Sequence, residues 1–113
     1  MSSVFTKIID REIPSTVVAE DDRVIAIEDI APKAPVHVLV IPKTDAYANV
    51  AELAAGDPDL LAHVVATAQR IADERAGGQF RLVFNTGEAA GQTVFHVHAH
   101  VLAGDLQEGT LAS

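Results

Sequence analysis

The stretch from residue 95 to residue 102 alternates apolar residues with histidine, and this alternation limits how the chain can fold there. At the two-residue period of a β-strand, His96, His98 and His100 lie on one face and the intervening apolar residues lie on the other. Three adjacent imidazoles cost stability, because they are polar and compete for protons near neutral pH. The chain has only five histidines. One face of this stretch is therefore expected to carry chemistry, and the other to be core.

Length and composition place residues 1–113 in one globular domain. A chain of 113 residues, 49% hydrophobic and 21% charged, can bury one core and is too short for two. It has no cysteine, so a reducing, cytoplasmic location is expected. The net charge of −8 argues against nucleic acid or anionic membrane as a partner, because cationic side chains bind both. An anionic small ligand would therefore need local donors.

The spacing of apolar residues predicts an antiparallel α+β domain. The expected elements are a short helix over 4–11, strands over 16–20, 24–28, 36–41, 80–85 and 95–102, and a long helix from residue 57 to residue 76. Asp57 can cap the long helix, Pro58 suits its first turn, and Gly77 ends it. His63 falls on the polar stripe of that helix and is assigned to solvent. The tail, residues 104–113, is expected to be irregular.

A metal site is one chemical interpretation of the histidine stretch. On a strand, same-face residues two apart are about 6.5 to 7 Å apart, and residues four apart are roughly 13 Å apart. The spacing therefore supports two metal ligands but not three, and the flanking loop adds no His, Cys or Asp. A surface histidine stripe with adventitious metal affinity is a further alternative.

Covalent phosphoryl or nucleotidyl transfer is the other interpretation. A neutral imidazole nitrogen is a good nucleophile near pH 7 when an acceptor holds the proton of the other nitrogen. The middle histidine, His98, has support on both sides, and the glycine-containing loop over 86–93 can turn N–H groups towards a phosphate. His37, taken alone, is more simply a hydrogen-bonded core histidine.

The stretch His96-Val97-His98-Ala99-His100-Val101-Leu102 resembles the signature of the histidine triad (HIT) family, in which three histidines alternate with apolar residues. Further segments occur in the family's order: residues 4–14, 20–22, 29–37, 40–43, 83–85 and 91–94. The resemblance runs from about residue 4 to residue 103. Within the family, the sequence is most similar to the Hint branch, the purine nucleoside phosphoramidases, although Phe95 stands where Hint proteins often have tyrosine.

This resemblance implies a five-stranded antiparallel sheet with one long and one short helix, paired into a homodimer. It implies binding of a purine nucleoside monophosphate or its phosphoramidate, without a metal or other cofactor. His98 would attack the α-phosphorus and form a nucleotidyl-histidine that water resolves. His96 and His100 would flank the phosphate and help to fix the tautomer of His98, with His37 supporting them from a neighbouring strand. Zinc could still bind His96 and His98 opportunistically.

The resemblance also assigns substrate-binding residues. Asp29 would bind the ribose hydroxyls, although an acid there could simply cap a turn. The phosphate and leaving group would be contacted by residues of the 85–93 segment: Asn85, Gly91, Gln92 and Thr93. The base pocket would be lined by apolar residues that would serve equally well as core: Phe5, Ile8, Ile13 and Ile30. Two alternatives stay open: a nucleotide-binding regulatory module with vestigial catalysis, and a dinucleoside polyphosphate hydrolase.

Overall fold

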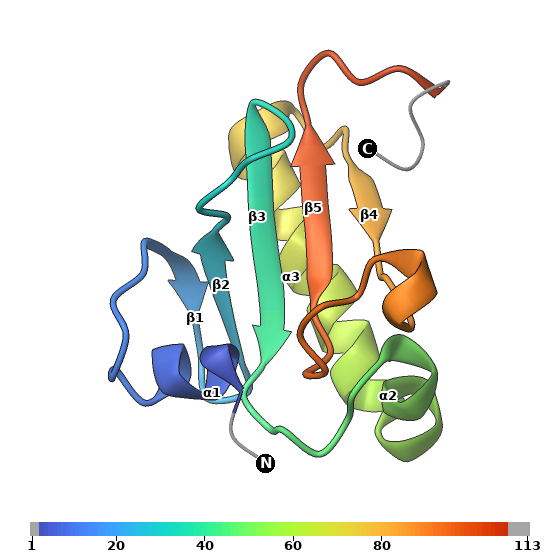
Figure 1. Ribbon diagram of the computed structural model, residues 1–113. Coiled ribbons are helices and arrows are strands. Elements are labelled where there is room, and N and C mark those ends of the chain that lie inside the picture. Colours follow the sequence, from blue (N-terminus) through green and yellow to red (C-terminus); the bar gives the residue numbers. More distant parts are fainter. Residues whose placement is uncertain (1–2, 109–113) are drawn as a thin grey trace.

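The computed structural model describes residues 3–108 as a five-stranded antiparallel sheet with helices on both faces (Figure 1). The strands lie in the order β1-β2-β3-β5-β4. The elements, in chain order, are α1 (Val4–Ile9), β1 (Val17–Glu20), β2 (Val24–Glu28), β3 (Val36–Pro42), α2 (Val50–Gly56), α3 (Pro58–Ala76), β4 (Arg81–Val83), the 3-10 helix η1 (Glu88–Ala90) and β5 (Ala99–Ala103). The predicted α+β class and antiparallel sheet are confirmed.

Helix α3 forms as its sequence predicts. The Asp57 carboxylate accepts a hydrogen bond from the backbone N–H of Leu60 at 3.0 Å, and Pro58 occupies the first turn. Gly77 ends the helix with φ +62°, a left-handed conformation that favours glycine. Helix α3 lies behind β3 and β5 (Figure 1). Its apolar stripe packs against the sheet, with Val64 and Ala68 fully buried.

The alternation of strands β2 and β3 separates two cores, one on each face of the sheet. Val24 and Ala26 of β2 belong to the core beneath α3. Ile25 and Ile27 point the other way and pack with Phe5 of α1. Helix α1 therefore covers part of the face opposite α3. The rest of that face, towards β4, is not covered by α1 (Figure 1).

Helix α2 was not predicted, and its signal is a variant of the capping box in which Glu52 reaches the residue before the N-cap. The Asn49 side chain accepts a hydrogen bond from Glu52 N at 2.9 Å, and the Glu52 carboxylate accepts one from Ala48 N at 2.9 Å. The residues Asn49 and Glu52, three apart, are the sequence pattern of this motif. The prediction of one long and one short helix therefore omitted a second short helix.

The strand expected over 95–102 is shorter in the structure, where β5 begins at Ala99. Its first partner is Val40 of β3, and beyond that pair β3 runs towards its end at Pro42. Residues 94–98 are not in a strand and make no ladder pair with β3, so strict alternation of faces does not apply there. Strand β4 is likewise shorter than predicted, Arg81–Val83 rather than 80–85.

His63 is not a free solvent residue as expected. Its Nε2 atom lies 2.7 Å from Asp21 Oδ2, which joins α3 to the turn between β1 and β2. Hydrogen bonds from the backbone N–H groups of Arg23 and Val24, with the His63 contact added, lower the pKa of Asp21 to about 2.

None of the helices in residues 3–108 combines the length and the hydropathy that a membrane-spanning helix requires.

Candidate active site

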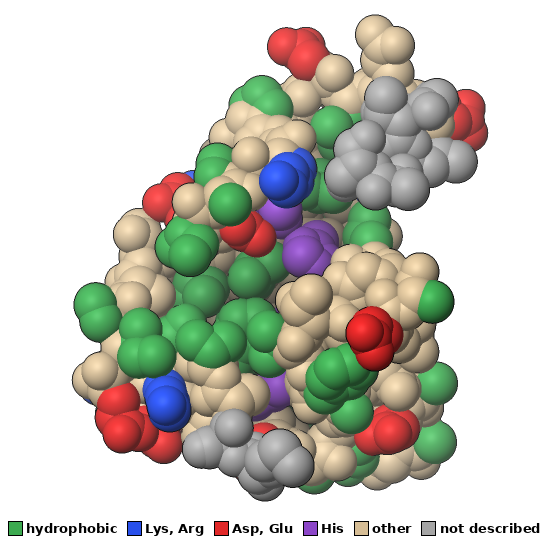
Figure 2. All heavy atoms as spheres, in the orientation of Figure 1, with side chains coloured by type: hydrophobic (Ala, Val, Ile, Leu, Met, Phe, Trp, Pro, Cys, Tyr) green, Lys and Arg blue, Asp and Glu red, His purple; other side chains and the backbone are tan. Residues whose placement is uncertain are grey.

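Two hollows lie on the sheet face opposite α3 and meet at Asp29 and His100. The larger, about 540 Å³, extends over β4 and the end of β5; the smaller, about 330 Å³, extends over β2 and β3 beneath α1. Figure 2 shows histidine side chains at the bottom of a depression on this face, with hydrophobic side chains beside them. The junction of the two hollows therefore holds the titratable groups.

His96 does not face this junction. It is 1% exposed, and its Nε2 atom donates to the carbonyl oxygen of Pro42 at 2.7 Å. Its Nδ1 atom therefore accepts from the Ser3 hydroxyl, at 3.1 Å. Because both ring nitrogens are used, the predicted roles of His96 beside the phosphate and as a zinc partner of His98 do not agree with the structure. The cause is the irregular backbone over 94–98, which turns this ring into the fold.

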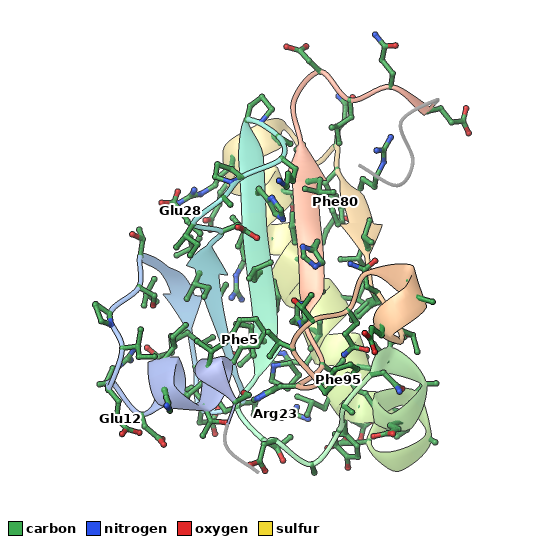
Figure 3. All side chains as sticks on the ribbon, viewed as in Figure 1. Phe5, Glu12, Arg23, Glu28, Phe80 and Phe95 are labelled. Atoms are coloured by element: carbon green, nitrogen blue, oxygen red, sulfur yellow. The ribbon has the colours of Figure 1, made fainter. Side chains whose placement is uncertain are left out.

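Ser3 is a residue that the sequence interpretation missed. Its hydroxyl donates to His96 and also accepts from the backbone N–H of Thr6 at 3.2 Å, which caps α1. Figure 3 shows Phe5, two residues on, extending from α1 over the sheet. The Phe5 ring meets the His98 ring edge-on, with centroids 4.8 Å apart. Ser3 thus attaches the helix that covers the smaller hollow to the histidine segment.

His98 is held in one tautomer by a backbone carbonyl. Its Nδ1 atom lies 2.8 Å from the carbonyl oxygen of His96, and a carbonyl only accepts, so Nδ1 carries the proton. The Nε2 atom of His98 is then unprotonated and has a free lone pair. The sequence interpretation gave this orienting role to neighbouring imidazoles, but a main-chain atom fills it.

His100 and His37 form a directed pair behind this nucleophile. The backbone N–H of Lys33 donates to His37 Nδ1 at 3.0 Å, so His37 carries its proton on Nε2. That proton is donated to His100 Nδ1 at 3.0 Å, which leaves His100 Nε2–H as a donor towards a ligand. Asp29 Oδ2 lies 3.4 Å from His37 Nε2. The structure therefore places His37 next to His100, as the resemblance implied.

Burial keeps these imidazoles neutral. It lowers the pKa of His98 and of His37 below the ordinary value of 6.5. For His100, burial and then the neighbouring His98 and His37 lower the pKa to about 4. At pH 7 the site thus presents one nucleophilic nitrogen and one neutral N–H donor.

These shifts predict that acid destabilises the fold. Between pH 6.5 and 5 the unfolded chain binds more protons than the folded one, so the free energy of unfolding should fall as pH falls. Urea unfolding at pH 7, 6 and 5 measures this, and His100→Gln should reduce the slope. Below about 4.5, the lowered pKa values of Glu20 and Asp21 add to the same loss. Stability that is constant or rises from pH 6.5 to 5 would contradict this assignment.

The predicted substrate residues divide into those that line the hollows and those that do not. Asn85 and Gly91 line the larger hollow and Thr93 lines the smaller one. Gln92 is 3% exposed, and its side-chain amide accepts from Gly87 N at 2.9 Å and donates to Val94 O at 3.0 Å. Gln92 therefore organises the loop from inside and does not face a phosphate.

The residues predicted for the base pocket lie in the smaller hollow only in part. Phe5 and Ile8 line the smaller hollow, together with Leu39, which the sequence interpretation did not include. Ile13 packs at the edge of the core and is not among the lining residues. Ile30 lies at the rim and is 99% exposed, so a ligand would have to cover it.

Asp29 shows the turn contact that was the alternative to ribose binding. Its Oδ1 atom accepts from Ala31 N at 2.8 Å, while Oδ2 faces the junction of the hollows. Asp29, His37 and His100 offer ligand atoms within 4.8 Å of one another. These three residues, rather than His96 and His98, are the group among the described residues that could hold a cation.

Comparison with known proteins extends the similarity over the whole domain. The family model described as "Scavenger mRNA decapping enzyme C-term binding" matches residues 2–113. The purine nucleoside phosphoramidase of Escherichia coli strain K12 is 40% identical over 104 residues, covering 90% of this chain and 87% of that protein. Adenylylsulfatase HINT1 of Arabidopsis thaliana is 41% identical over 104 residues, covering 90% and 71%. The solved structure of a HIT family hydrolase from Clostridium thermocellum superposes with a TM-score of 0.87 at 50% identity, covering 94% of each chain.

Proposed function

Because the chain belongs to the histidine triad (HIT) family of hydrolases, we propose that it cleaves purine nucleoside 5′-phosphoramidates, or acyl-nucleotides, to the nucleoside monophosphate. The observation that carries this proposal is the hydrogen bond from His98 Nδ1 to the His96 carbonyl, which leaves Nε2 free to attack phosphorus. A relative that is 40% identical is named a purine nucleoside phosphoramidase, which supports the same substrate class.

In the proposed first step, His98 Nε2 forms a bond to the α-phosphorus as the bond from phosphorus to the leaving nitrogen breaks. A substrate protonated on that nitrogen releases a neutral amine, so charge and protons balance. His98 becomes a cationic nucleotidyl-histidine, and its Nδ1–H remains hydrogen-bonded to the His96 carbonyl. His100 Nε2–H donates to a phosphoryl oxygen, and Asn85 and Thr93 are within the same pair of hollows.

In the second step, water attacks phosphorus, the bond to His98 breaks, and a proton passes to solvent. The imidazole returns to its starting tautomer with its lone pair on Nε2. None of these steps needs a divalent ion, so we expect chelators to leave turnover unchanged.

A substrate panel tests this function. Adenosine and guanosine 5′-phosphoramidates, an acyl-adenylate and a dinucleoside polyphosphate would be incubated with the protein, and monophosphate release would be followed by chromatography. Fastest cleavage of the phosphoramidates or acyl-adenylate is expected. Fastest cleavage of the dinucleoside polyphosphate would assign the other hydrolase class. AMP binding with no turnover of any substrate would favour a regulatory nucleotide-binding module.

Asp29→Ala should weaken AMP binding by about ten- to a hundredfold, because each charge-assisted hydrogen bond to a ribose hydroxyl contributes about 1.5 to 3 kcal/mol. The loss for 2′,3′-dideoxy-AMP should be much smaller. Calorimetric titration of both ligands measures this, and Asp29→Asn keeps an acceptor for Ala31 N as a control for the turn. An equal loss for both ligands would make Asp29 a turn residue only.

The active form is proposed to be a homodimer. Strand β4 is at the edge of the sheet and pairs only with β5 among the described strands. Val65 of α3 is an exposed apolar residue that a second copy could cover. Light scattering during turnover measures the active mass, and a fully active monomer would contradict this proposal.

A further inference from the structure

The two hollows differ in chemistry. The smaller is walled by apolar side chains such as Phe5, Ile27 and Leu39, which suit the faces of a purine ring. The larger hollow has apolar walls from Val83 and Leu102. It is also lined by two polar residues, Asn85 and Lys33. The two therefore suit different parts of one ligand.

Their common boundary gives the direction of that ligand. Asp29 and His100 line both hollows, while His98 lines only the smaller one. Under the proposed function, on which this step rests, the α-phosphate lies against His98 and His100. A nucleoside in the smaller hollow then leaves the larger hollow for the group on the other side of phosphorus, which is the leaving group.

Lys33 gives the larger hollow its cation. Among the described residues, the Lys33 ammonium has no hydrogen-bond or ion-pair partner, while its backbone N–H is fixed on His37. Lys33 lines the hollow from an exposed position. Its charge also helps to lower the pKa of His37, after burial and against Asp29, which raises it. Asp29 is the acid in the same hollow, and its Oδ1 atom is held by Ala31 N. In a chain of net charge −8, the Lys33 ammonium is a local donor for an anion.

We propose that the larger hollow is a leaving-group subsite in which Lys33 selects amines that carry a carboxylate, such as an amino acid attached to the phosphate through its amino group. The apolar walls contributed by Val83 and Leu102 cover the carbon chain of this amine. The Lys33 ammonium pairs with the carboxylate, and Asn85 is an additional donor at the same wall. The preference concerns the leaving group and not the nucleotide.

Two substrates matched except for charge test this subsite: the adenosine 5′-phosphoramidate of 6-aminohexanoate and that of its carboxamide. The ratio of their kcat/KM values should favour the carboxylate by about two- to fivefold, as expected for one partly exposed ion pair. Lys33→Gln should bring the ratio to about one, and Lys33→Glu should invert it. Lys7→Gln, which removes an exposed lysine outside both hollows, should keep the wild-type ratio.

A binding measurement separates this inference from the proposed function. The same two compounds can be titrated calorimetrically into His98→Ala protein with Lys33 or with Lys33→Gln. A preference for the carboxylate that depends on Lys33, without turnover by the wild type, would retain the subsite and reject the phosphoramidase. Equal affinity for both compounds, or a preference that survives Lys33→Gln, would overturn the subsite even if turnover is rapid.

Discussion

Replacing His98 with alanine should lower the turnover of adenosine 5′-phosphoramidate by about three to six powers of ten, the scale of loss when a covalent nucleophile is removed. The affinity for AMP should change by only a few fold, because the other residues that line the smaller hollow, including Asp29, remain. The residue is half-buried and makes one hydrogen bond, so the fold should tolerate the change. Steady-state kinetics and calorimetric AMP titration on the same preparation measure both quantities.

The chemistry of the trapped intermediate provides the control. A nucleotidyl-histidine is labile in acid and stable in alkali, so radiolabelled nucleotide should remain on the wild-type protein after an alkaline quench and be absent from His98→Ala. A label that is lost in alkali, or that persists on the alanine variant, would place the nucleophile elsewhere. Turnover by His98→Ala within tenfold of the wild type would show that no covalent step through this residue is needed.

His96→Ala should act on stability, with a loss of about 2 to 4 kcal/mol in the free energy of unfolding. The substitution leaves a cavity and removes the hydrogen-bond partners of the Pro42 carbonyl and the Ser3 hydroxyl. Denaturant unfolding measures the loss, and His98→Ala is the matched control with a smaller expected change. Ser3→Ala, which removes the bond to His96 and also the cap of α1, should cost about 2 kcal/mol.

The opposite pattern would restore the sequence interpretation. If His96→Ala were as stable as the wild type and inactive, the side chain of His96 would act on substrate after all. The two histidines are two residues apart in the chain and are expected to separate cleanly in these measurements.

The elements with complete local signals were predicted well. Helix α3 has a capping acid, a proline in its first turn, an apolar stripe and a terminal glycine, so neighbouring residues alone determine its bounds. Strands β2 and β3 are short runs of β-branched residues between turns. The triad motif identified the family, and the structure brings His37 to His100 from another strand.

The errors have a common physical cause. Assigning His96 and Gln92 to the ligand assumed regular alternation or exposed loop positions, but their orientation depends on contacts far away in the chain. His96 is fixed by Pro42, and Gln92 donates to the carbonyl of Ala48 at 2.6 Å. A single sequence carries no record of such pairings. The helix cap at Asn49 was available locally and was overlooked.

The sheet order also determines when the fold can be completed during synthesis. Strand β5 is the last strand in the chain but lies between β3 and β4. Strands β1 to β3 can pair as successive hairpins as they emerge, whereas β4 has no described neighbour until β5 arrives. The contact between Ser3 and His96 spans 93 positions, so the attachment of α1 to the histidine segment also waits, although its local cap does not. The smaller hollow therefore lacks His98 and His100 until the segment that carries β5 has been synthesised, and β3 exposes an unpaired edge until then.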